Sequence, residues 1–350
     1  MEKRVYIFHH TDLDGIGVKI LGILYAQQQG LPYKTVSCGY STVNGNVMNM
    51  INEAKDVAEV IIGDISVDEE TGAKLNKWIR KTGVSVRLRD HHETAHALNK
   101  YAWAIVHECD EYKVDRCGTW MLSQDEDFQE ITARNKVLIE AIDAWDTWKW
   151  KRANNLHAKN LNALLSIIGE EDFTEYCLSL DGKLKEPADL FDTEKSAMIK
   201  AFRLFIKKQL DSYDKYMYTM NLWVMNRVHS KKQIKLKTGV IFCNANLSEI
   251  GDGMLDRHPE LDLLMMISFP GSISWRTQKQ LDIPLGKIAK MATGNGGGHP
   301  MAAGSTVSFN QFKDSLIRFM DKNFAAEMDY SDLLSPYEIK KLKESKEQFV

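Results

Sequence analysis

Short apolar runs alternate with helical stretches over the first part of the chain. Four runs rich in β-branched and aromatic residues have the length of buried strands: 5–8, 33–37, 57–63 and 84–88. Apolar residues at helical spacing predict three helices between them: 15–28, 43–54 and 68–81. This alternation is typical of an α/β domain with a mostly parallel sheet, right-handed crossovers and flanking helices.

The pattern changes after residue 154, and the remaining chain divides into three predicted segments. Residues 155–220 are mostly helical and charged and form a predicted bridge, with loops at 170–172 and 183–186. Residues 221–330 form a smaller α/β domain, and residues 331–350 a charged C-terminal tail. The smaller domain is predicted to contain strands at 221–228, 235–243, 261–269 and 272–276, a turn at 230–233, a helix at 283–292, a strand near Thr306 and a helix at 311–320.

The composition is that of a globular protein. A length of 350 residues favours two domains, the first being residues 1–154. The net charge of −3 gives no sign of a broadly basic surface, so local positive groups or metals must hold any anionic substrate. Five cysteines without a Cys-x-x-Cys pair indicate reduced thiols rather than a thiolate zinc site. No signal peptide or bilayer-spanning stretch is found, which predicts a cytoplasmic protein without a membrane partner; a homodimer is left open.

Polar clusters follow three of the predicted strands. His10, Asp12 and Asp14 come directly after the first strand, Asp64 ends the third, and Asp90-His91-His92 ends the fourth. Each cluster alone also fits a loop or a helix cap. Because ligand sites of open α/β sheets form outside the carboxyl ends of the strands, the three clusters together predict one site. A fourth cluster, 143–148, lies at the end of a helical stretch and offers Asp143 and Asp146.

The donor types in these clusters indicate a pair of divalent cations. Carboxylates and imidazoles without thiolates favour Mn²⁺, ahead of Zn²⁺ or Fe²⁺. The number of Asp and His residues exceeds what one ion needs, so a two-metal site is expected. Two ions about 3.5–4 Å apart can bind and deprotonate a water between them and neutralise a phosphoryl group, which indicates phosphoester hydrolysis.

A glycine-rich segment in the second half indicates a phosphate-binding site. The backbone N–H groups of Gly296, Gly297 and Gly298 can approach phosphate oxygens closely, and the His299 imidazole can donate to the same group. Arg276 can bind a phosphate through two parallel hydrogen bonds. A glycine run also occurs in flexible turns, and the neighbouring histidine and arginine favour the phosphate site.

The order of these motifs resembles the DHH phosphoesterase superfamily. The similar sequence is His10-Thr11-Asp12-Leu13-Asp14-Gly15, a strand-end Asp64, Asp90-His91-His92 and Asp146-Thr147. In the second half, residues 296–304 resemble the signature of the associated DHHA1 domain, and Ser274-Trp275-Arg276-Thr277 resembles its arginine-bearing strand. Members include RecJ-type exonucleases, nanoRNases, cyclic-dinucleotide phosphodiesterases and manganese pyrophosphatases.

The resemblance implies a role for each motif residue. His10, Asp12 and Asp64 would hold one metal, and Asp14, Asp64, His91 and Asp146 the other, so that Asp64 bridges; Asp143 remains the alternative to Asp146. Asp90 would orient the histidines, and His92 would act near the substrate. Phe8 stands where many relatives place the first His. His10, two residues before Asp12, matches the exonuclease and nanoRNase-like branches instead.

The resulting hypothesis is a two-metal, Mn²⁺-dependent phosphodiesterase. It would hydrolyse short oligonucleotides to mononucleotides by attack of a bridging hydroxide on phosphorus, while the DHHA1-like domain (221–330) binds a substrate phosphate. The alternatives are a cyclic-dinucleotide or 3′-phosphoadenosine-5′-phosphate hydrolase and a RecJ-like single-strand exonuclease. A different class is a nucleotide-binding scaffold without catalytic activity.

Overall fold

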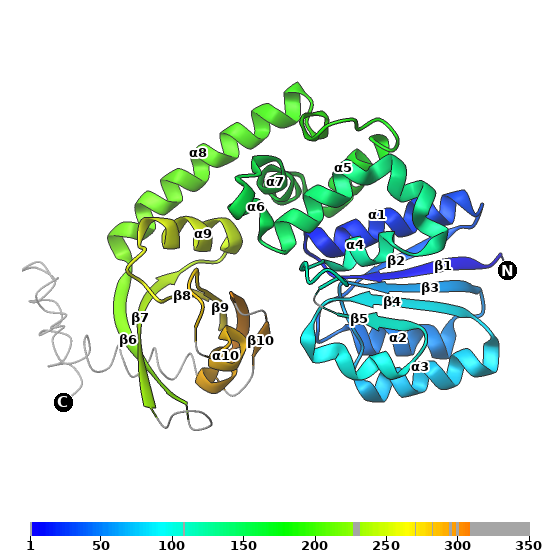
Figure 1. Ribbon diagram of the computed structural model, residues 1–350, viewed down its shortest axis with the longest axis horizontal. Helices are drawn as coiled ribbons and strands as arrows, with labels where there is room; N and C mark the ends of the chain where they lie inside the picture. Colours follow the sequence, from blue (N-terminus) through cyan, green and yellow to red (C-terminus); the bar gives the residue numbers. More distant parts are fainter. Residues whose placement is uncertain are drawn as a thin grey trace, which may run out of the picture. The chain divides into compact units, whose positions relative to one another are not determined.

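The computed structural model forms two compact units, Met1–Gln209 and Leu210–Val350 (Figure 1). The structure describes residues 2–107, 109–226, 232–269, 271–281, 283–293, 296–298 and 301–308. His299, the predicted helix at 311–320 and the tail at 331–350 lie outside the described residues. The α/β class is confirmed. The predicted domain boundaries stay predictions.

A five-stranded parallel sheet, in the order β2-β1-β3-β4-β5, forms the centre of the first unit. The strands are β1 (Arg4–His9), β2 (Tyr33–Ser37), β3 (Val57–Gly63), β4 (Ser85–Asp90) and β5 (Ala104–Val106). The register aligns their ends, because Gly63 pairs with both His9 of β1 and Arg89 of β4. The residues that follow these paired positions, His10, Asp64 and Asp90, therefore lie at the same end of the sheet, the carboxyl ends of its strands.

Helices cover both faces of this sheet (Figure 1). One face is covered by α1 (Leu13–Gln28) and α4 (Gly118–Ser123), and the other by α2 (Val43–Glu53) and α3 (Glu69–Thr82). Helices α5 (Gln129–Asp146), α6 (Lys149–Ala153) and α7 (Leu156–Ser179) pack mainly on other helices, and α8 (Thr193–Tyr216) continues into the second unit. Strand β1 alternates between two cores: Val5 and Ile7 pack with α1, α5 and α7, whereas Tyr6 and Phe8 pack with α2 and α3. None of the described helices is long and apolar enough to cross a membrane.

One predicted loop is wrong. Residues 170–172 lie inside α7, directly after a break at Gly169, where φ is 80° and ψ is 171°. The three acidic residues thus occupy the first turn after the break, where unpaired N–H groups favour negative charge. Leu161, Leu164 and Phe173 of α7 also pack into the core of the first unit.

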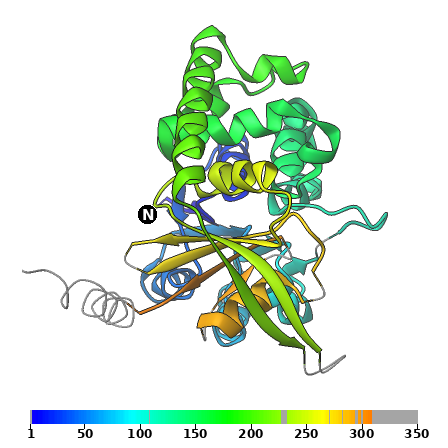
Figure 2. The ribbon, with the colours of Figure 1, turned by 90° about the vertical axis from the view of Figure 1, so that its left-hand side faces the viewer.

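A six-stranded mixed sheet, in the order β10-β11-β9-β8-β7-β6, forms the second unit. The strands are β6 (Tyr218–Asn226), β7 (Lys232–Phe242), β8 (Leu263–Ser268), β9 (Ser272–Arg276), β10 (Gly297–Gly298) and β11 (Ala302–Thr306). Figure 2 shows β6 and β7 as a long twisted ribbon. Lys232 and Gln233, predicted in the turn, belong to β7. Helix α10 (Leu285–Thr293) matches the prediction, and α9 (Leu247–Arg257) was not predicted.

Candidate metal centre

Three overlapping groups of potential metal ligands lie at the carboxyl edge of the parallel sheet. The donor atoms within each group lie within 4.8 Å of one another. The groups are His10, Asp12 and Asp64; Asp64, His91 and His92; and Asp14, His91 and Asp146. The structure thus brings together every residue that the sequence predicted as a metal ligand. Asp64 and His91 each belong to two groups.

The two oxygens of Asp64 face different histidines. His10 Nδ1 lies 3.6 Å from Asp64 Oδ2 and 2.8 Å from Asp12 Oδ2. His91 Nε2 lies 3.3 Å from Asp64 Oδ1, 3.4 Å from Asp146 Oδ2 and 3.9 Å from Asp14 Oδ2. Asp64 is therefore placed to act as a ligand on both sides, as a bridging carboxylate would.

The donor set fits two divalent cations. Asp64 Oδ2 and Asp146 Oδ2 are buried, and neither accepts a hydrogen bond from the described residues. Burying a carboxylate oxygen without a donor is costly unless a cation compensates it. Carboxylates with imidazoles are the ligands that ions such as Mn²⁺ accept in proteins. The uncompensated oxygens and the donor types both point to metal binding at this edge.

Burial and the crowding of carboxylates shift the pKa values of these groups. Burial, reinforced by the charges of Asp12 and Asp14, raises the pKa of Asp64 above its usual range. Burial raises the pKa of Asp146 to about 7, although His91 opposes this shift. Burial disfavours protonated His10, yet its interactions with Asp12 and Asp64 raise its pKa to about 11. Without metal, the site therefore keeps protons that cations would displace.

Comparisons with known proteins support one superfamily. No protein-family model matches the chain. It is 26% identical over 320 residues to oligoribonuclease NrnB of Bacillus subtilis (strain 168), which covers 87% of this chain and 73% of that protein. RecJ of Thermus thermophilus in complex with Mn²⁺ aligns over 91% of this chain and 52% of its own, with a TM-score of 0.53 and 12% identity. Exonuclease RecJ bound to manganese aligns over 94% of this chain and 91% of its own, with a TM-score of 0.52 and 14% identity.

The similarity to oligoribonuclease NrnB supports the resemblance to the DHH/DHHA1 phosphoesterase superfamily that the sequence motifs indicated. The predicted class, a metal-dependent phosphoesterase, is confirmed by the oligoribonuclease relative together with the donor groups. The likeness to the RecJ structures supports the fold, and the chain spans about half of the Thermus thermophilus RecJ chain.

The backbone around the DHH ligands is unusually constrained. Asp64 has a φ of 55°, in the left-handed region that non-glycine residues seldom adopt. Its N–H donates to the carbonyl of Arg89 at 3.0 Å, which holds this conformation beside the Asp-His-His motif. Such strained backbone is found most often at functional sites. The observed strain therefore adds to the evidence for the site.

The start of α4 holds Asp14. Gly118 N and Thr119 N donate to the two Asp14 carboxylate oxygens at 2.7 and 2.8 Å, and Thr119 Oγ1 donates to the Asp14 carbonyl at 2.6 Å. A Cβ on Gly118 would lie 2.8 Å from Asp64 N, so only glycine fits here. Sequence reasoning missed Gly118 and Thr119. The signal was a glycine followed by a threonine at the start of an amphipathic stretch.

A chain of hydrogen bonds connects the Asp-His-His motif to Tyr40. Asp90 Oδ1 accepts from His92 Nδ1 at 2.6 Å, and its Oδ2 accepts from Ser66 Oγ at 2.5 Å. Burial opposes protonation of His92, but Asp90 raises its pKa. With a proton on Nδ1, His92 Nε2 in its neutral form accepts from the Tyr40 hydroxyl at 2.9 Å. Asp90 thus orients His92.

Sequence reasoning also missed Tyr40. Its side chain is 59% exposed, and its ring lies 5.3 Å from the His10 ring and 5.7 Å from the His92 ring. Tyr40 follows the carboxyl end of β2. Because ligand sites form outside the carboxyl ends of parallel strands, the reasoning that identified the Asp and His residues could have identified Tyr40 as well.

Asp143 has different partners from Asp146. It accepts hydrogen bonds from Lys149 Nζ at 2.6 Å, Cys117 N at 3.1 Å and Arg116 Nη1 at 3.2 Å. It belongs to none of the donor groups found among the described residues. The geometry therefore favours Asp146 as the fourth-motif ligand, and the assignment stays a prediction.

Of the predicted phosphate-binding residues, Arg276, Gly297 and Gly298 belong to the sheet of the second unit, and His299 lies outside the described residues. Arg276 of β9 pairs with Ala302 of β11, and Gly298 of β10 pairs with the next residue, Ala303. Arg276 Nη1 donates to Ser274 Oγ at 2.7 Å and to the Trp275 carbonyl at 2.9 Å. Burial lowers the pKa of Arg276 to about 10, although Glu249 opposes this shift, and the group stays cationic at neutral pH.

Proposed function

We propose that this protein is a manganese-dependent phosphodiesterase that cleaves short oligonucleotides to mononucleotides. The observation that carries the proposal is the set of three Asp and His donor groups that share Asp64 and His91. The similarity to an oligoribonuclease, which extends over 87% of this chain and 73% of that relative, supports a short ribonucleotide substrate. Cytoplasmic location and a homodimer stay predictions from the sequence.

Each motif residue has a role in the proposal. His10, Asp12 and Asp64 would hold one cation, and Asp14, Asp64, His91 and Asp146 would hold the second. Bound cations would lower the pKa of a water molecule and neutralise charge on the phosphoryl group. Asp90 keeps His92 in one orientation, so that the imidazole can hydrogen-bond to the substrate beside Tyr40.

A substrate panel tests this function. The protein is stripped with a chelator, its metal content is measured, and Mn²⁺, Mg²⁺, Zn²⁺ or Fe²⁺ is added back singly. Di- to pentaribonucleotides, cyclic dinucleotides, 3′-phosphoadenosine-5′-phosphate and long single-stranded DNA are then compared by kcat/KM. We expect Mn²⁺ to restore the highest activity, and short ribonucleotides to be the best substrates. Full turnover by protein shown to be metal-free would exclude the mechanism, and no turnover of any substrate would favour a scaffold.

Arg276, Gly296, Gly297, Gly298 and His299 are proposed to bind a second phosphate of the substrate. Because that contact positions the scissile phosphate, losing it should impair natural substrates more than a small ester that lacks it. We expect Arg276→Ala to lower kcat/KM for a trinucleotide at least about 100-fold, as for a lost charge-assisted contact of about 3 kcal/mol. Metal content should stay unchanged, and hydrolysis of bis-p-nitrophenyl phosphate should fall much less.

The same variant also tests a purely structural role of Arg276. The side chain is bonded to Ser274 and to backbone within its own sheet, so it could simply stabilise β9. Equal losses on both substrates, or a lower Tm of Arg276→Ala, would support that role and remove the phosphate contact. Arg276→Lys keeps the charge but cannot form paired hydrogen bonds with a phosphate. Its kcat/KM for the trinucleotide should lie between those of the wild type and Arg276→Ala.

A further inference from the structure

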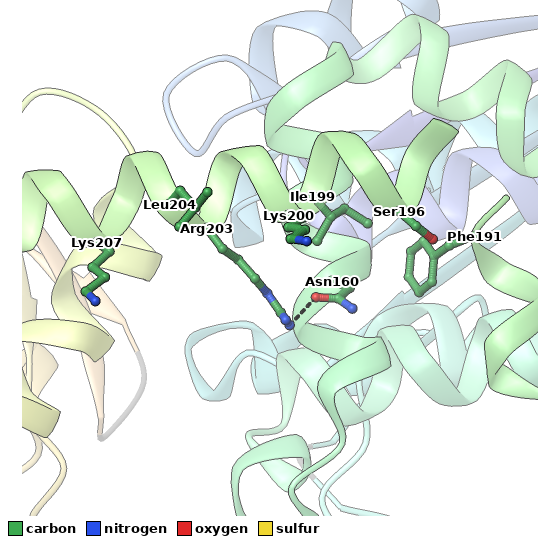
Figure 3. A pocket seen from close by; sticks show the side chains of 8 residues that line it. All are labelled: Asn160, Phe191, Ser196, Ile199, Lys200, Arg203, Leu204 and Lys207. Atoms are coloured by element: carbon green, nitrogen blue, oxygen red, sulfur yellow. Dashed lines mark hydrogen bonds between the residues drawn. The ribbon is translucent and has the colours of Figure 1, made fainter. Parts of the chain in front are cut away.

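A groove outside the metal centre lies between α7 and α8 of the first unit. It has a volume of about 460 Å³. Figure 3 shows the side chains that line it: Asn160, Phe191, Ser196, Ile199, Lys200, Arg203, Leu204 and Lys207. All of them lie within residues 160–207, so the groove belongs entirely to the unit that carries the metal ligands. None of these residues has a role in the proposed chemistry.

Three cations occupy one side of the groove. Lys200, Arg203 and Lys207 follow one another on α8 at helical spacing and are all exposed. Arg203 donates to Asn160 Oδ1 across the groove, which fixes the guanidinium and leaves most of its donors available (Figure 3). Within the described parts of the chain, neither Lys200 nor Lys207 forms an ion pair with a carboxylate.

The acidic residues of α8 are paired elsewhere. Glu194 lies 3.4 Å from Lys195, and Asp211 and Asp214 both bind Arg257. The positive charge of the groove is therefore not neutralised by its own helix. A net positive groove on a protein with a net charge of −3 is a local feature that suits an anionic ligand.

Apart from Asn160 and Ser196, the rest of the lining is apolar. Leu204 is 58% exposed, Phe191 is partly exposed, and Ile199 is buried. The Phe191 ring lies 6.3 Å from the His157 ring at an angle of 11°, which holds it in one orientation. A cationic side with an aromatic ring is the combination that binds single-stranded nucleic acids, because phosphates meet the cations and bases stack on the ring.

We propose that the α7–α8 groove binds the distal nucleotides of a single-stranded oligonucleotide. This inference rests on the proposed nucleotide substrate and adds a second contact region for longer strands. The helix rise separates Lys200, Arg203 and Lys207 by about 4.5 and 6 Å along α8. At roughly 3.4 Å between successive phosphates of a stacked strand, the three cations span about three phosphate-to-phosphate intervals. The groove shares no residue with the metal centre, so we expect hydrolysis of a dinucleotide not to depend on it and binding of an octanucleotide to use it.

Charge removal with a matched control tests the groove. The variant Lys200→Ala/Arg203→Ala/Lys207→Ala is compared with Lys77→Ala/Arg80→Ala/Lys81→Ala, which removes the same charges from the exposed side of α3. Binding of a fluorescein-labelled octaribonucleotide is measured by anisotropy in chelator, where no hydrolysis occurs, at low and at near-physiological salt. Hydrolysis of the dinucleotide and the octanucleotide is measured with Mn²⁺.

The groove variant should bind the octanucleotide about tenfold or more weakly at low salt. Its slope of log K against log salt should become less steep by about 2, from roughly 0.7 for each lost phosphate contact. Dinucleotide kcat/KM should stay within about twofold, and the α3 variant should behave like the wild type in both assays. A Phe191→Leu variant should weaken binding without changing the salt slope.

Several results would overturn the inference. Equal weakening by the α3 variant would show a general charge effect, and an equal loss on the dinucleotide would show structural damage. Unchanged octanucleotide binding would remove the groove as a contact. Competition by a polyglutamate peptide as strong as by unlabelled octanucleotide would point to an acidic protein partner. If the protein hydrolyses no nucleotide at all, the anisotropy data still show whether the groove binds the octanucleotide. Failure of the proposed hydrolase function can therefore be distinguished from failure of the proposed groove contact.

Discussion

Asp64 shows most clearly how single residues determine the metal centre. Its backbone adopts a left-handed conformation that is unfavourable for a residue other than glycine. Its side chain is buried, and burial together with two neighbouring carboxylates raises its pKa. Each of these costs free energy in the metal-free protein. The packing of β3 against β1 and β4 imposes the position, and cations between the donor groups would compensate the charge.

Asp146 and Asp143 should respond differently to substitution. Asp146→Ala removes a carboxylate from a donor group, so we expect it to lower metal content and activity together without lowering the Tm of the metal-free protein. Asp143→Ala breaks hydrogen bonds with Arg116, Lys149 and the Cys117 backbone, so it should lower Tm by several degrees while retaining metal. Elemental analysis and thermal melts of both variants test this. The opposite ranking in metal content would make Asp143 the ligand.

Tyr40→Phe should impair turnover but not metal binding. The substitution keeps the exposed ring and removes the hydroxyl that donates to His92 Nε2. We expect kcat for a dinucleotide to fall about tenfold, in line with the loss of one hydrogen bond of about 1.4 kcal/mol, with unchanged metal content. Tyr33→Phe, which also removes an exposed hydroxyl but lies on β2, is the control. Wild-type kcat in Tyr40→Phe would show that the hydroxyl has no part in the reaction.

At the scale of elements, the short helix α4 supports the ligands from outside the sheet. Its first two N–H groups neutralise part of the charge of Asp14, and its first residue lies against the Asp64 backbone. An N–H pair at a helix start is a favourable partner for a carboxylate. The metal centre therefore depends on a helix that contributes no ligand.

Gly118→Ala should disturb the metal centre through this contact. The added Cβ would lie 2.8 Å from Asp64 N and 3.1 Å from Asp14 Oδ2, so α4 must move. We expect a loss of about 1–3 kcal/mol in unfolding free energy and weaker metal binding. Gly45→Ala in α2 is the matched control. A Cβ there meets nothing within 4 Å, so it should stabilise the protein by roughly 0.5–1 kcal/mol. Urea unfolding and metal titration check both, and equal effects would contradict the close contact.

At the scale of the whole molecule, metal binding and folding stability should be coupled through pH. Five groups of the metal centre have raised pKa values in the folded protein. The pKa rises to about 7 for Asp146 and to about 11 for His10, and it is also raised for Asp64, His91 and His92. The folded metal-free chain therefore binds more protons than the unfolded chain between about pH 5 and pH 7.5, and its stability must fall as the pH rises through this window.

Thermal melts with and without Mn²⁺ measure this coupling. The Tm of the metal-free protein should decrease from about pH 5 to about pH 7.5. Metal binding requires the ionised carboxylates and displaces these protons, so the increase in Tm on adding Mn²⁺ should be larger at the higher pH. At a Mn²⁺ concentration of about 100 times Kd, the stabilisation is about 2.7 kcal/mol. A metal-free Tm that rises over this range would contradict the raised pKa values.

Much of the first unit could be predicted because its signals are local. The runs at 33–37 and 57–63 are strands with the predicted bounds. Strand β3 is buried in the parallel sheet and needs only a short apolar run between turns, whereas the edge strand β2 is marked by its aromatic and β-branched residues. Helix α9 could not be predicted, because Gly251, Gly253, Asp252 and Asp256 lower its helix propensity. Packing forms it instead: Gly251 lies against Arg276 and Met266, and Gly253 against Leu210.

The sequence by itself determined the donor types and the edge of the sheet at which they gather. In a parallel sheet all carboxyl ends face one way, so motifs after separate strands must converge. Only the tertiary structure decided which carboxylates face the site. Asp143 and Asp146 lie three residues apart on one side of α5, and contacts with Arg116 and Lys149, which no local pattern encodes, separate them. The α4 start and Tyr40 were likewise placed by packing between segments remote in sequence, which leaves no periodic signal in the chain.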